Sequence, residues 1–114
     1  MTEAERETVS RVGKQLLEEG LTRATGGNVS TRTADGTVAI SPSGVPYPEI
    51  EPEDVPVVSM DGEQVYGSDP PSSETPMHTS IYEHRPEVGG VVHSHSPYAS
   101  TFAVLDRPIT GTHY

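Results

Sequence analysis

A pair of histidines two residues apart follows a short apolar run late in the chain, where residues 88–98 read V-G-G-V-V-H-S-H-S-P-Y. The apolar run predicts a buried strand. Because successive side chains of a strand point to opposite faces, His93 and His95 are expected to share one face. Imidazole suits Zn²⁺ and other borderline divalent ions, and a catalytic zinc usually takes three protein ligands. The pattern therefore predicts two ligands of a metal ion at the end of a strand, and a solvated pair on a polar strand edge is the alternative.

The residues that follow the histidine pair predict a helix. Ser96 before Pro97 is typical of an N-cap followed by proline at the first helical position, and the helix would run on to residue 105. A buried strand, a ligand pair and a helix start, in that order, are typical of the places where α/β folds carry their chemistry. We therefore expect an α/β fold with its site directly after this strand.

Length and charge limit the class of protein. The 114 residues are enough for one domain, and 32% hydrophobic residues with 11 Gly and 11 Pro predict a lean core and many loops. Acidic residues number 17 against 7 Lys and Arg, and the net charge of −10 argues against nucleic acid or an anionic membrane as a partner. There is no cysteine, so thiolate metal sites and disulfides are excluded. The charged N-terminus and the lack of a long apolar run predict a cytoplasmic protein.

Two helices are expected besides the one after the histidine pair. Thr2 and Glu5 form a T-E-A-E capping box before a segment whose apolar residues recur at helical spacing, and Gly20 is the expected left-handed stop. A second helix is predicted over residues 77–84, with Ile81 as its clearest apolar position. Its two histidines are expected at the surface or in a capping role.

Strands are expected in two hairpins. Residues 28–33 and 37–41 flank a D-G turn, and residues 56–59 and 64–66 flank an M-D-G-E turn. The stretch 45–54 between the hairpins is rich in proline and acid, which predicts an extended connection.

Three clusters of small polar residues and glycine lie between these elements: T-G-G-N at 25–28, S-P-S-G at 41–44 and S-S-E at 72–74. Glycine lets the backbone come close to a ligand, and consecutive free N–H groups can bind an anion. Each cluster alone reads as an ordinary turn or helix cap. Three of them in one small domain, together with a His-x-His pair, predict an anion-binding pocket beside a metal ion.

The succession T-G-G-N-V-S, S-P-S-G, S-S-E, V-V-H-S-H-S-P-Y-A and T-H-Y, in this order and spacing, resembles the class II aldolase/adducin family, typified by fuculose-phosphate aldolase. The resemblance spans nearly the whole chain. It implies an α/β/α sandwich with a mainly antiparallel central sheet, usually assembled as a homotetramer with active sites between subunits.

The resemblance also implies roles for particular residues. His93 and His95 resemble two of the three zinc histidines, and Glu74 resembles the acid that ligates zinc in the resting site and acts as base once substrate displaces it. Tyr114 resembles a tyrosine, donated by a neighbouring subunit, that assists proton transfer. The residues that resemble the phosphate-holding loops are Thr25, Gly27, Asn28, Ser43, Gly44, Ser72 and Ser73.

The implied reaction is the reversible aldol cleavage of a ketose 1-phosphate, of the fuculose or rhamnulose type, to dihydroxyacetone phosphate and an aldehyde. Zn²⁺ is the expected ion, with another divalent metal as the alternative. A methylthioribulose-phosphate dehydratase and a ribulose-phosphate 4-epimerase are the alternatives within the family. The epimerases of the family resemble one another in having Asp at the position of Glu74. The glutamate therefore favours aldol cleavage or dehydration over epimerisation.

Two other classes of protein are open. A non-catalytic interaction module like the adducin head would lack the metal ligands, whereas Glu74, His93 and His95 are present here. A cupin-like barrel also uses His-x-His, but its ligand Glu follows a few residues on, where this chain reads S-P-Y-A-S-T.

The chain departs from the family in length. Family domains are close to twice as long, and their third zinc histidine lies well downstream of the pair. Of the other histidines, His78 and His84 fall on the predicted helix, where a surface or capping role is expected. The resemblance gives His113 no ligand role. We therefore expect residues 1–114 to be the first part of the family's domain, a fragment whose activity alone is in question.

Overall fold

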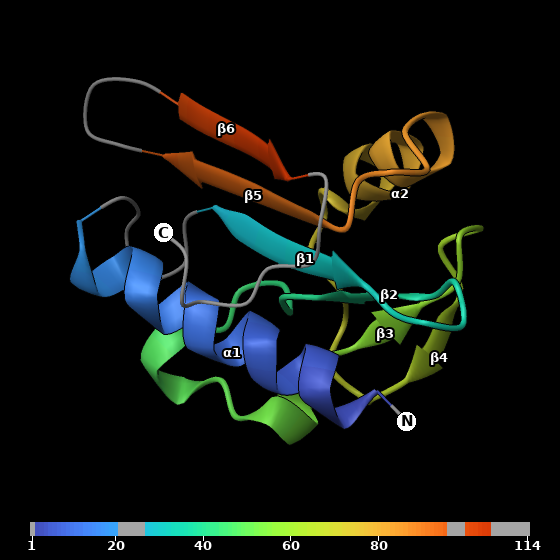
Figure 1. Cartoon of the computed structure of the whole chain (residues 1–114). Coiled ribbons are helices and arrows are strands. Elements are labelled where there is room, and N and C mark those ends of the chain that lie inside the picture. Colours follow the sequence, from blue (N-terminus) through green and yellow to red (C-terminus); the bar gives the residue numbers. More distant parts are fainter. Residues whose placement is uncertain (1, 21–26, 96–99, 106–114) are drawn as a thin grey trace.

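A six-stranded antiparallel sheet forms the middle of the molecule in the computed structural model, which describes residues 2–20, 27–95 and 100–105, with the backbone alone for 94–95 and 100–105. The strands are β1 (Asn28–Arg32), β2 (Val38–Ile40), β3 (Val57–Val58), β4 (Gln64–Tyr66), β5 (Gly90–His95) and β6 (Ser100–Leu105). Their order is β4-β3-β2-β1-β5-β6, with every neighbouring pair antiparallel (Figure 1). β1 therefore lies between its hairpin partner β2 and the histidine strand β5.

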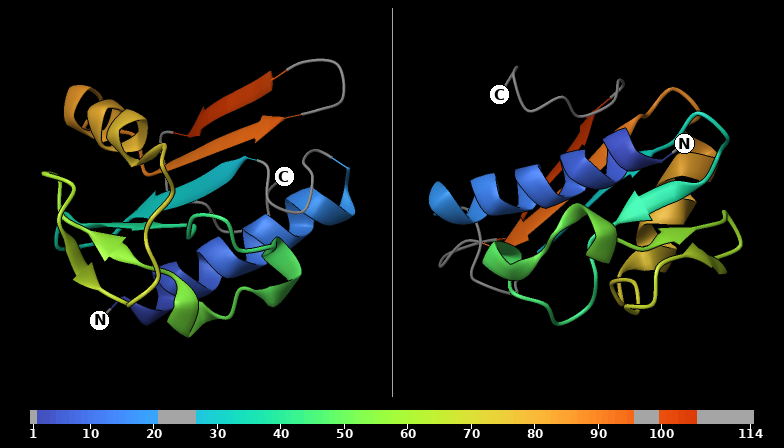
Figure 2. Two further views of the ribbon diagram at one scale, coloured as in Figure 1. Left: turned by 180° about the vertical axis from the view of Figure 1, so that it is seen from behind. Right: turned by 90° about the horizontal axis from the view of Figure 1, so that it is seen from below.

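Two helices cover opposite faces of the sheet, α1 (Glu3–Glu18) one face and α2 (Thr75–His84) the other (Figures 1 and 2). The alternation of side chains along β1 produces this division. Val29 packs in one cluster with Val9 of α1, and its neighbour Ser30 bonds to Tyr82 of α2. The layers confirm the expected α/β/α sandwich with an antiparallel sheet.

α1 begins after Thr2 and ends at Glu18, as predicted, but without the capping box. The Thr2 hydroxyl accepts a hydrogen bond from Arg6 Nε at 3.2 Å instead of bonding a free backbone N–H. Arg6 is buried, with its guanidinium 4.1 Å from the centre of the Tyr66 ring, and a buried charge needs acceptors. Gly20 has a φ of +74°, which confirms the left-handed stop.

Both predicted hairpins are present, but the extended connection predicted over 45–54 is wrong. The chain there forms two short 3₁₀ helices, η1 (Tyr47–Glu49) and η2 (Pro52–Asp54), each with proline in its first turn, where the fixed φ favours a helix. Tyr47 is buried against Gly13 of α1, where an added Cβ would lie 2.7 Å from Cε1 of the ring. The glycine thus allows α1 to approach η1 closely.

The helix predicted over 96–105 is also wrong in the part that the structure describes. Residues Ser100–Leu105 form β6, paired with β5 from Gly90↔Leu105 to His95↔Ser100. This segment reads S-T-F-A-V-L, whose β-branched and aromatic residues suit a strand. Pairing also satisfies the backbone groups along the outer edge of β5, which a helix would not.

α2 packs on the sheet through Tyr82 and not mainly through Ile81, which was the expected contact. Tyr82 is 1% exposed and belongs to the second core cluster, whereas Ile81 is only partly buried against it. Arg32 of β1 fixes the end of the helix, since its Nη2 donates to the carbonyl of Tyr82 at 2.9 Å and its Nε to the carbonyl of Val88 at 3.1 Å. The guanidinium also lies 4.8 Å from the centre of the Tyr82 ring.

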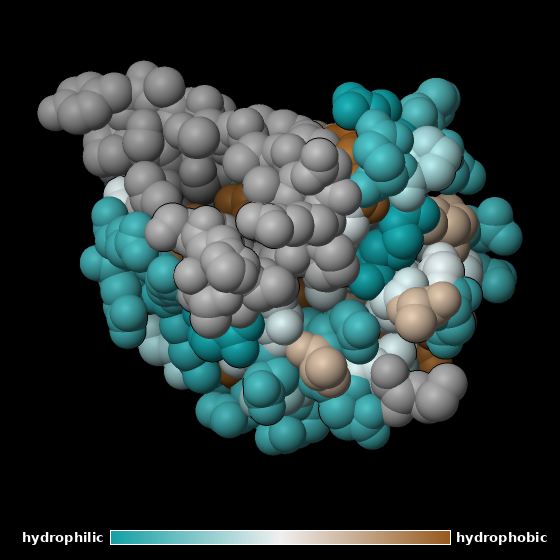
Figure 3. Space-filling model, in the orientation of Figure 1, coloured by the Kyte–Doolittle hydropathy of each residue, from teal (hydrophilic) through white to brown (hydrophobic). Residues whose placement is uncertain are grey.

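The surface in Figure 3 is mostly hydrophilic over the described residues that it shows, in keeping with the net charge of −10. Among the described residues the large apolar side chains that stand out are Val65 and Tyr66 on β4, which are 57% and 39% exposed. No helix of this part of the chain combines the length and apolar character of a membrane span.

Candidate functional site

The three polar clusters and the histidine strand meet at one end of the sheet. Because β1 is antiparallel to both β2 and β5, the start of β1 lies beside the ends of those two strands. Asn28 at the start of β1 is therefore paired in register with His93. Ser41 follows β2 and joins the same place, since its N–H donates to Val29 O at 2.9 Å and its hydroxyl accepts from Val29 N at 3.1 Å.

The second and third clusters are held side by side by backbone contacts. Pro42 and Pro71 form an isolated antiparallel bridge. Ser43 N donates to the carbonyl of Pro70 at 2.9 Å, and Ser72 N donates to the carbonyl of Ser41 at 3.0 Å. The loops 41–44 and 70–74, which lie far apart in the sequence, thus form one surface next to the start of β1.

The third cluster caps the start of α2. The Ser72 hydroxyl accepts a hydrogen bond from Glu74 N at 3.1 Å, and its carbonyl accepts from the Thr75 hydroxyl at 2.6 Å. Ser73 and Glu74 are exposed, and Glu74 is the N-cap residue of the helix. The positive end of the helix dipole and two exposed polar side chains therefore lie together at this end of the sheet.

The first cluster is described from Gly27 onward, and Thr25 lies outside the described residues. Gly27 has a φ of +75° and Gly44 in the second cluster a φ of +72°, a conformation that side chains rarely tolerate. Asn28 is only 4% exposed, whereas Ser43 and Gly44 lie open to solvent. The glycines thus shape turns on either side of a buried amide.

His78 of α2 contradicts the expectation of a surface position. It is 0% exposed, its Nδ1 lies 2.6 Å from the Ser30 hydroxyl, and its Nε2 lies 2.5 Å from Oδ1 of Asn28. The Ser30 hydroxyl continues to the hydroxyl of Tyr82 at 2.7 Å. Burial, and next the charge of nearby His93, lower the pKa of His78 to about 4, so the ring is neutral near pH 7.

A pattern in the sequence could have located His78. The buried residues of α2 follow the spacing i, i+3, i+4 and i+7 from Thr75, which is the inner stripe of a helix. His78 is the second member of that stripe and Tyr82 the last. The expectation of a surface position rests instead on the residue type alone, since polar side chains on a helix are usually exposed.

The metal ligands predicted from the sequence are only partly within the described region. His93 is half-buried at the end of β5, with its Nδ1 shielded from solvent, and Glu74 is exposed at the start of α2. The side chain of His95 and the whole of Tyr114 and His113 lie outside the described residues. Among side chains that are described, no three His, Asp or Glu residues lie together closely enough to hold an ion.

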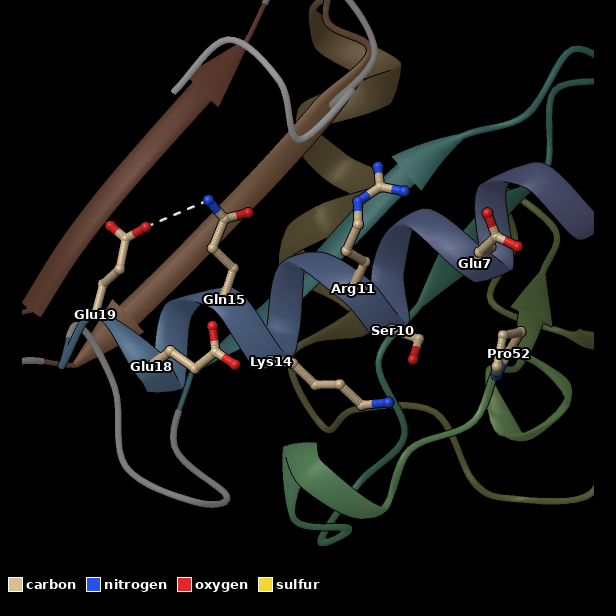
Figure 4. Close-up of a pocket in the computed structure, with 8 residues that line it drawn as sticks. All are labelled: Glu7, Ser10, Arg11, Lys14, Gln15, Glu18, Glu19 and Pro52. Carbon is tan, nitrogen blue, oxygen red and sulfur yellow. Dashed lines mark hydrogen bonds between the residues drawn. The ribbon is translucent and has the colours of Figure 1, made fainter.

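A hollow elsewhere on the molecule does not belong to this site. It lies on the outer side of α1, has a volume of about 570 Å³, and presents both acidic and basic side chains (Figure 4). None of the residues predicted to bind metal or phosphate lines it. Its lining is Glu7, Ser10, Arg11, Lys14, Gln15, Glu18, Glu19 and Pro52.

Comparison with known proteins agrees with the family suggested by the motifs. A model of the class II aldolase and adducin N-terminal domain matches residues 7–114. The chain is 44% identical to a 5-deoxy-D-ribulose 1-phosphate aldolase of Bacillus thuringiensis serovar kurstaki over 115 residues, which cover 100% of this chain and 54% of the relative. It is 45% identical to an L-ribulose-5-phosphate 4-epimerase of Salmonella paratyphi C over 89 residues, 77% of this chain and 39% of the relative.

The fold is likewise similar to solved structures. An L-fuculose 1-phosphate aldolase superposes with a TM-score of 0.78 and 36% sequence identity, over 82% of this chain and 45% of that chain. The chain spans about half the length of the curated relatives that it matches.

Proposed function

Since the chain belongs to the class II aldolase and adducin N-terminal domain family, we propose that it is the part of a metal-dependent aldolase that binds and cleaves a ketose 1-phosphate. The products are dihydroxyacetone phosphate and an aldehyde. The observation that carries the proposal is the meeting of the three polar clusters with Asn28 and His93 at one end of the sheet. The names of two similar proteins, a 5-deoxy-D-ribulose 1-phosphate aldolase and an L-fuculose 1-phosphate aldolase, support this substrate class.

The polar clusters are proposed to hold the phosphate group. The loops 41–44 and 70–74 form one surface, and the N-terminal end of α2 adds a positive dipole beside it. In a chain with a net charge of −10, such local donors are what allow an anion to bind. The residues assigned to this task are Gly27, Asn28, Ser43, Gly44, Ser72 and Ser73, with Thr25 from outside the described region.

His93, His95 and Glu74 are the proposed metal ligands. Two imidazoles and a carboxylate are a donor set that suits Zn²⁺, and the position of His93 beside the phosphate loops fits an ion placed next to the substrate. When bound, the ion supplies a Lewis acid for the oxygens of the ketose. Glu74 is open to solvent, so its carboxylate can reach a substrate and move a proton at the carbon next to the carbonyl.

The function is tested by loading the purified chain with Zn²⁺ and measuring the release of dihydroxyacetone phosphate. The substrates are 5-deoxy-D-ribulose 1-phosphate and L-fuculose 1-phosphate. We expect cleavage that requires the metal and that falls at least a hundredfold, roughly the contribution of a general base, in Glu74→Gln. A chain that binds one Zn²⁺ and cleaves neither sugar would overturn the proposal. The mass in solution, measured on the same sample, tests assembly into the expected homotetramer, to which Tyr114 would contribute across subunits.

Epimerisation is the second candidate reaction, because one relative of 45% identity is named as an L-ribulose-5-phosphate 4-epimerase. It would use the same phosphate and metal residues. Incubation with L-ribulose 5-phosphate separates the two reactions, since an epimerase yields a second pentulose phosphate and an aldolase does not. The resemblance implies Asp at position 74 in an epimerase, so Glu74 favours cleavage over epimerisation.

A further inference from the structure

A continuous line of buried polar groups runs from α2 to the start of β1. The hydroxyl of Tyr82 lies 2.7 Å from the hydroxyl of Ser30, which lies 2.6 Å from Nδ1 of His78. Nε2 on the other side of the ring lies 2.5 Å from Oδ1 of Asn28. All four residues are at most 4% exposed. The aldolase chemistry proposed above gives no role to three of them.

The chemistry of the four groups fixes the direction of each hydrogen bond. An amide oxygen only accepts, so Nε2 of His78 must carry a proton and donate it to Asn28. The ring is neutral near pH 7 because its pKa is lowered to about 4, so Nδ1 is an acceptor and takes the proton of the Ser30 hydroxyl. The Ser30 oxygen is then free to accept from Tyr82.

The far end of this line is the amide of Asn28. Because a planar amide holds its oxygen and nitrogen on separate branches, an oxygen turned toward His78 turns the two N–H donors away from it. Asn28 stands opposite His93 in the register of β1 and β5, and its chain neighbour Val29 is hydrogen-bonded to Ser41 of the second polar cluster. A flipped amide would instead present its oxygen there, which would repel an anion.

We propose that His78 is a positioning residue that holds the Asn28 amide with its N–H donors toward the phosphate group of the substrate. This inference rests on the proposed function, because it takes the polar clusters as the phosphate site. Ser30 and Tyr82 support this role, because their hydrogen bonds fix the tautomer of the His78 ring. No part of it requires His78 to touch substrate or metal.

The first test is the tautomer of His78 in the wild-type chain, free of metal, at pH 7. Long-range ¹H–¹⁵N correlation spectra show which ring nitrogen carries the proton. We expect the proton on Nε2. A ring protonated on Nδ1 would overturn the proposal, whatever the chain binds.

The second test is a titration with inorganic phosphate, followed through the side-chain amide signals of Asn28. His78→Phe keeps the ring volume but removes both nitrogens, and we expect it to weaken phosphate binding roughly tenfold, the loss of one oriented hydrogen bond to an anion. His78→Gln retains a donor and an acceptor and should bind within about threefold of wild type. His84→Gln, on the exposed end of the same helix, is the matched control and should bind as wild type does.

The outcomes separate this inference from the proposed function. If wild type does not bind phosphate, the assignment of the polar clusters as a phosphate site fails. A proton on Nε2 of His78 would then still show that the hydrogen bonds from Tyr82 to Asn28 are formed, but not that they serve phosphate binding. If wild type binds and a folded His78→Phe binds equally well, the positioning role is overturned and the proposed function stands. If His78→Phe does not fold, a tenfold loss in His78→Gln would equally overturn the role, because that variant keeps both hydrogen-bonding groups.

Discussion

Acidification from pH 7 to pH 5 should destabilise this protein through one buried group, His78. In the folded chain its pKa is about 4, whereas an unfolded chain gives histidine its ordinary value of 6.5. The unfolded state therefore binds a proton in a range where the folded state does not. By linkage, the neutral ring contributes stability that is fully present above about pH 6.5 and is lost as the pH falls toward 4.

The size of the effect follows from the two pKa values. Between pH 7 and pH 5 an unfolded histidine changes from mostly neutral to almost fully protonated, while His78 in the folded chain stays neutral. The free energy of unfolding should fall by about 2 kcal/mol over these two pH units. With a urea dependence of about 2 kcal/mol per molar, the midpoint should move by about 1 M.

The assay is urea unfolding at pH 7, 6 and 5, with a chelator present, on wild type, His78→Gln and His84→Gln. The glutamine at 78 keeps hydrogen-bonding groups but does not titrate, so its midpoint should change with pH by about 1 M less than that of wild type. Carboxylates titrate alike in all three proteins and cancel in the comparison. The exposed His84 serves as the control, and its variant should follow wild type. Equal pH dependence in wild type and His78→Gln would refute the reasoning.

Three further changes test other parts of the structure. Gly13→Ala should lower the free energy of unfolding by about 1–3 kcal/mol, because the added methyl meets the ring of Tyr47. The loss should be smaller in a Tyr47→Leu background, and equal losses in both backgrounds would contradict the close approach of Gly13 to Tyr47. His93→Ala should lower zinc affinity by orders of magnitude in calorimetric titration while His84→Ala leaves it unchanged, and parallel effects of the two changes would remove His93 from the ligand set. Arg32→Lys should cost about 1–2 kcal/mol in urea unfolding, since lysine cannot bond two carbonyls and cover a ring at once, and an unchanged midpoint would show that this contact contributes little.

The first helix and the two hairpins could be predicted from the sequence because local signals agreed with the fold, whereas the α/β/α layers were implied by the family resemblance. Gly20 ends α1 in the left-handed conformation, and the D-G turn at 35–36 joins β1 to β2 as expected. These signals lie within a few residues of the structure that they determine, so no knowledge of distant contacts was needed.

The remaining features depend on contacts between distant segments, which local patterns do not encode. Ser96 and Pro97 resemble a helix start, yet residues 100–105 form β6 because the edge of β5 offers backbone partners. His78 looks like a surface residue until Asn28 and Ser30, 50 and 48 residues away, supply its hydrogen bonds.

β1 pairs on one side with β2, which is close in the sequence, and on the other side with β5, which is far away in the sequence. This difference affects the order in which the strands can pair during folding. Thr33 bonds to Thr37 across 4 residues in the hairpin, whereas Thr31 bonds to the carbonyl of Gly89 across 58. Closing the longer loop costs about 2 kcal/mol more in chain entropy, so the hairpin can form early and β5 must join late. Asn28 meets His93 only in that late step, and the slowest part of folding is therefore also the step that assembles the site.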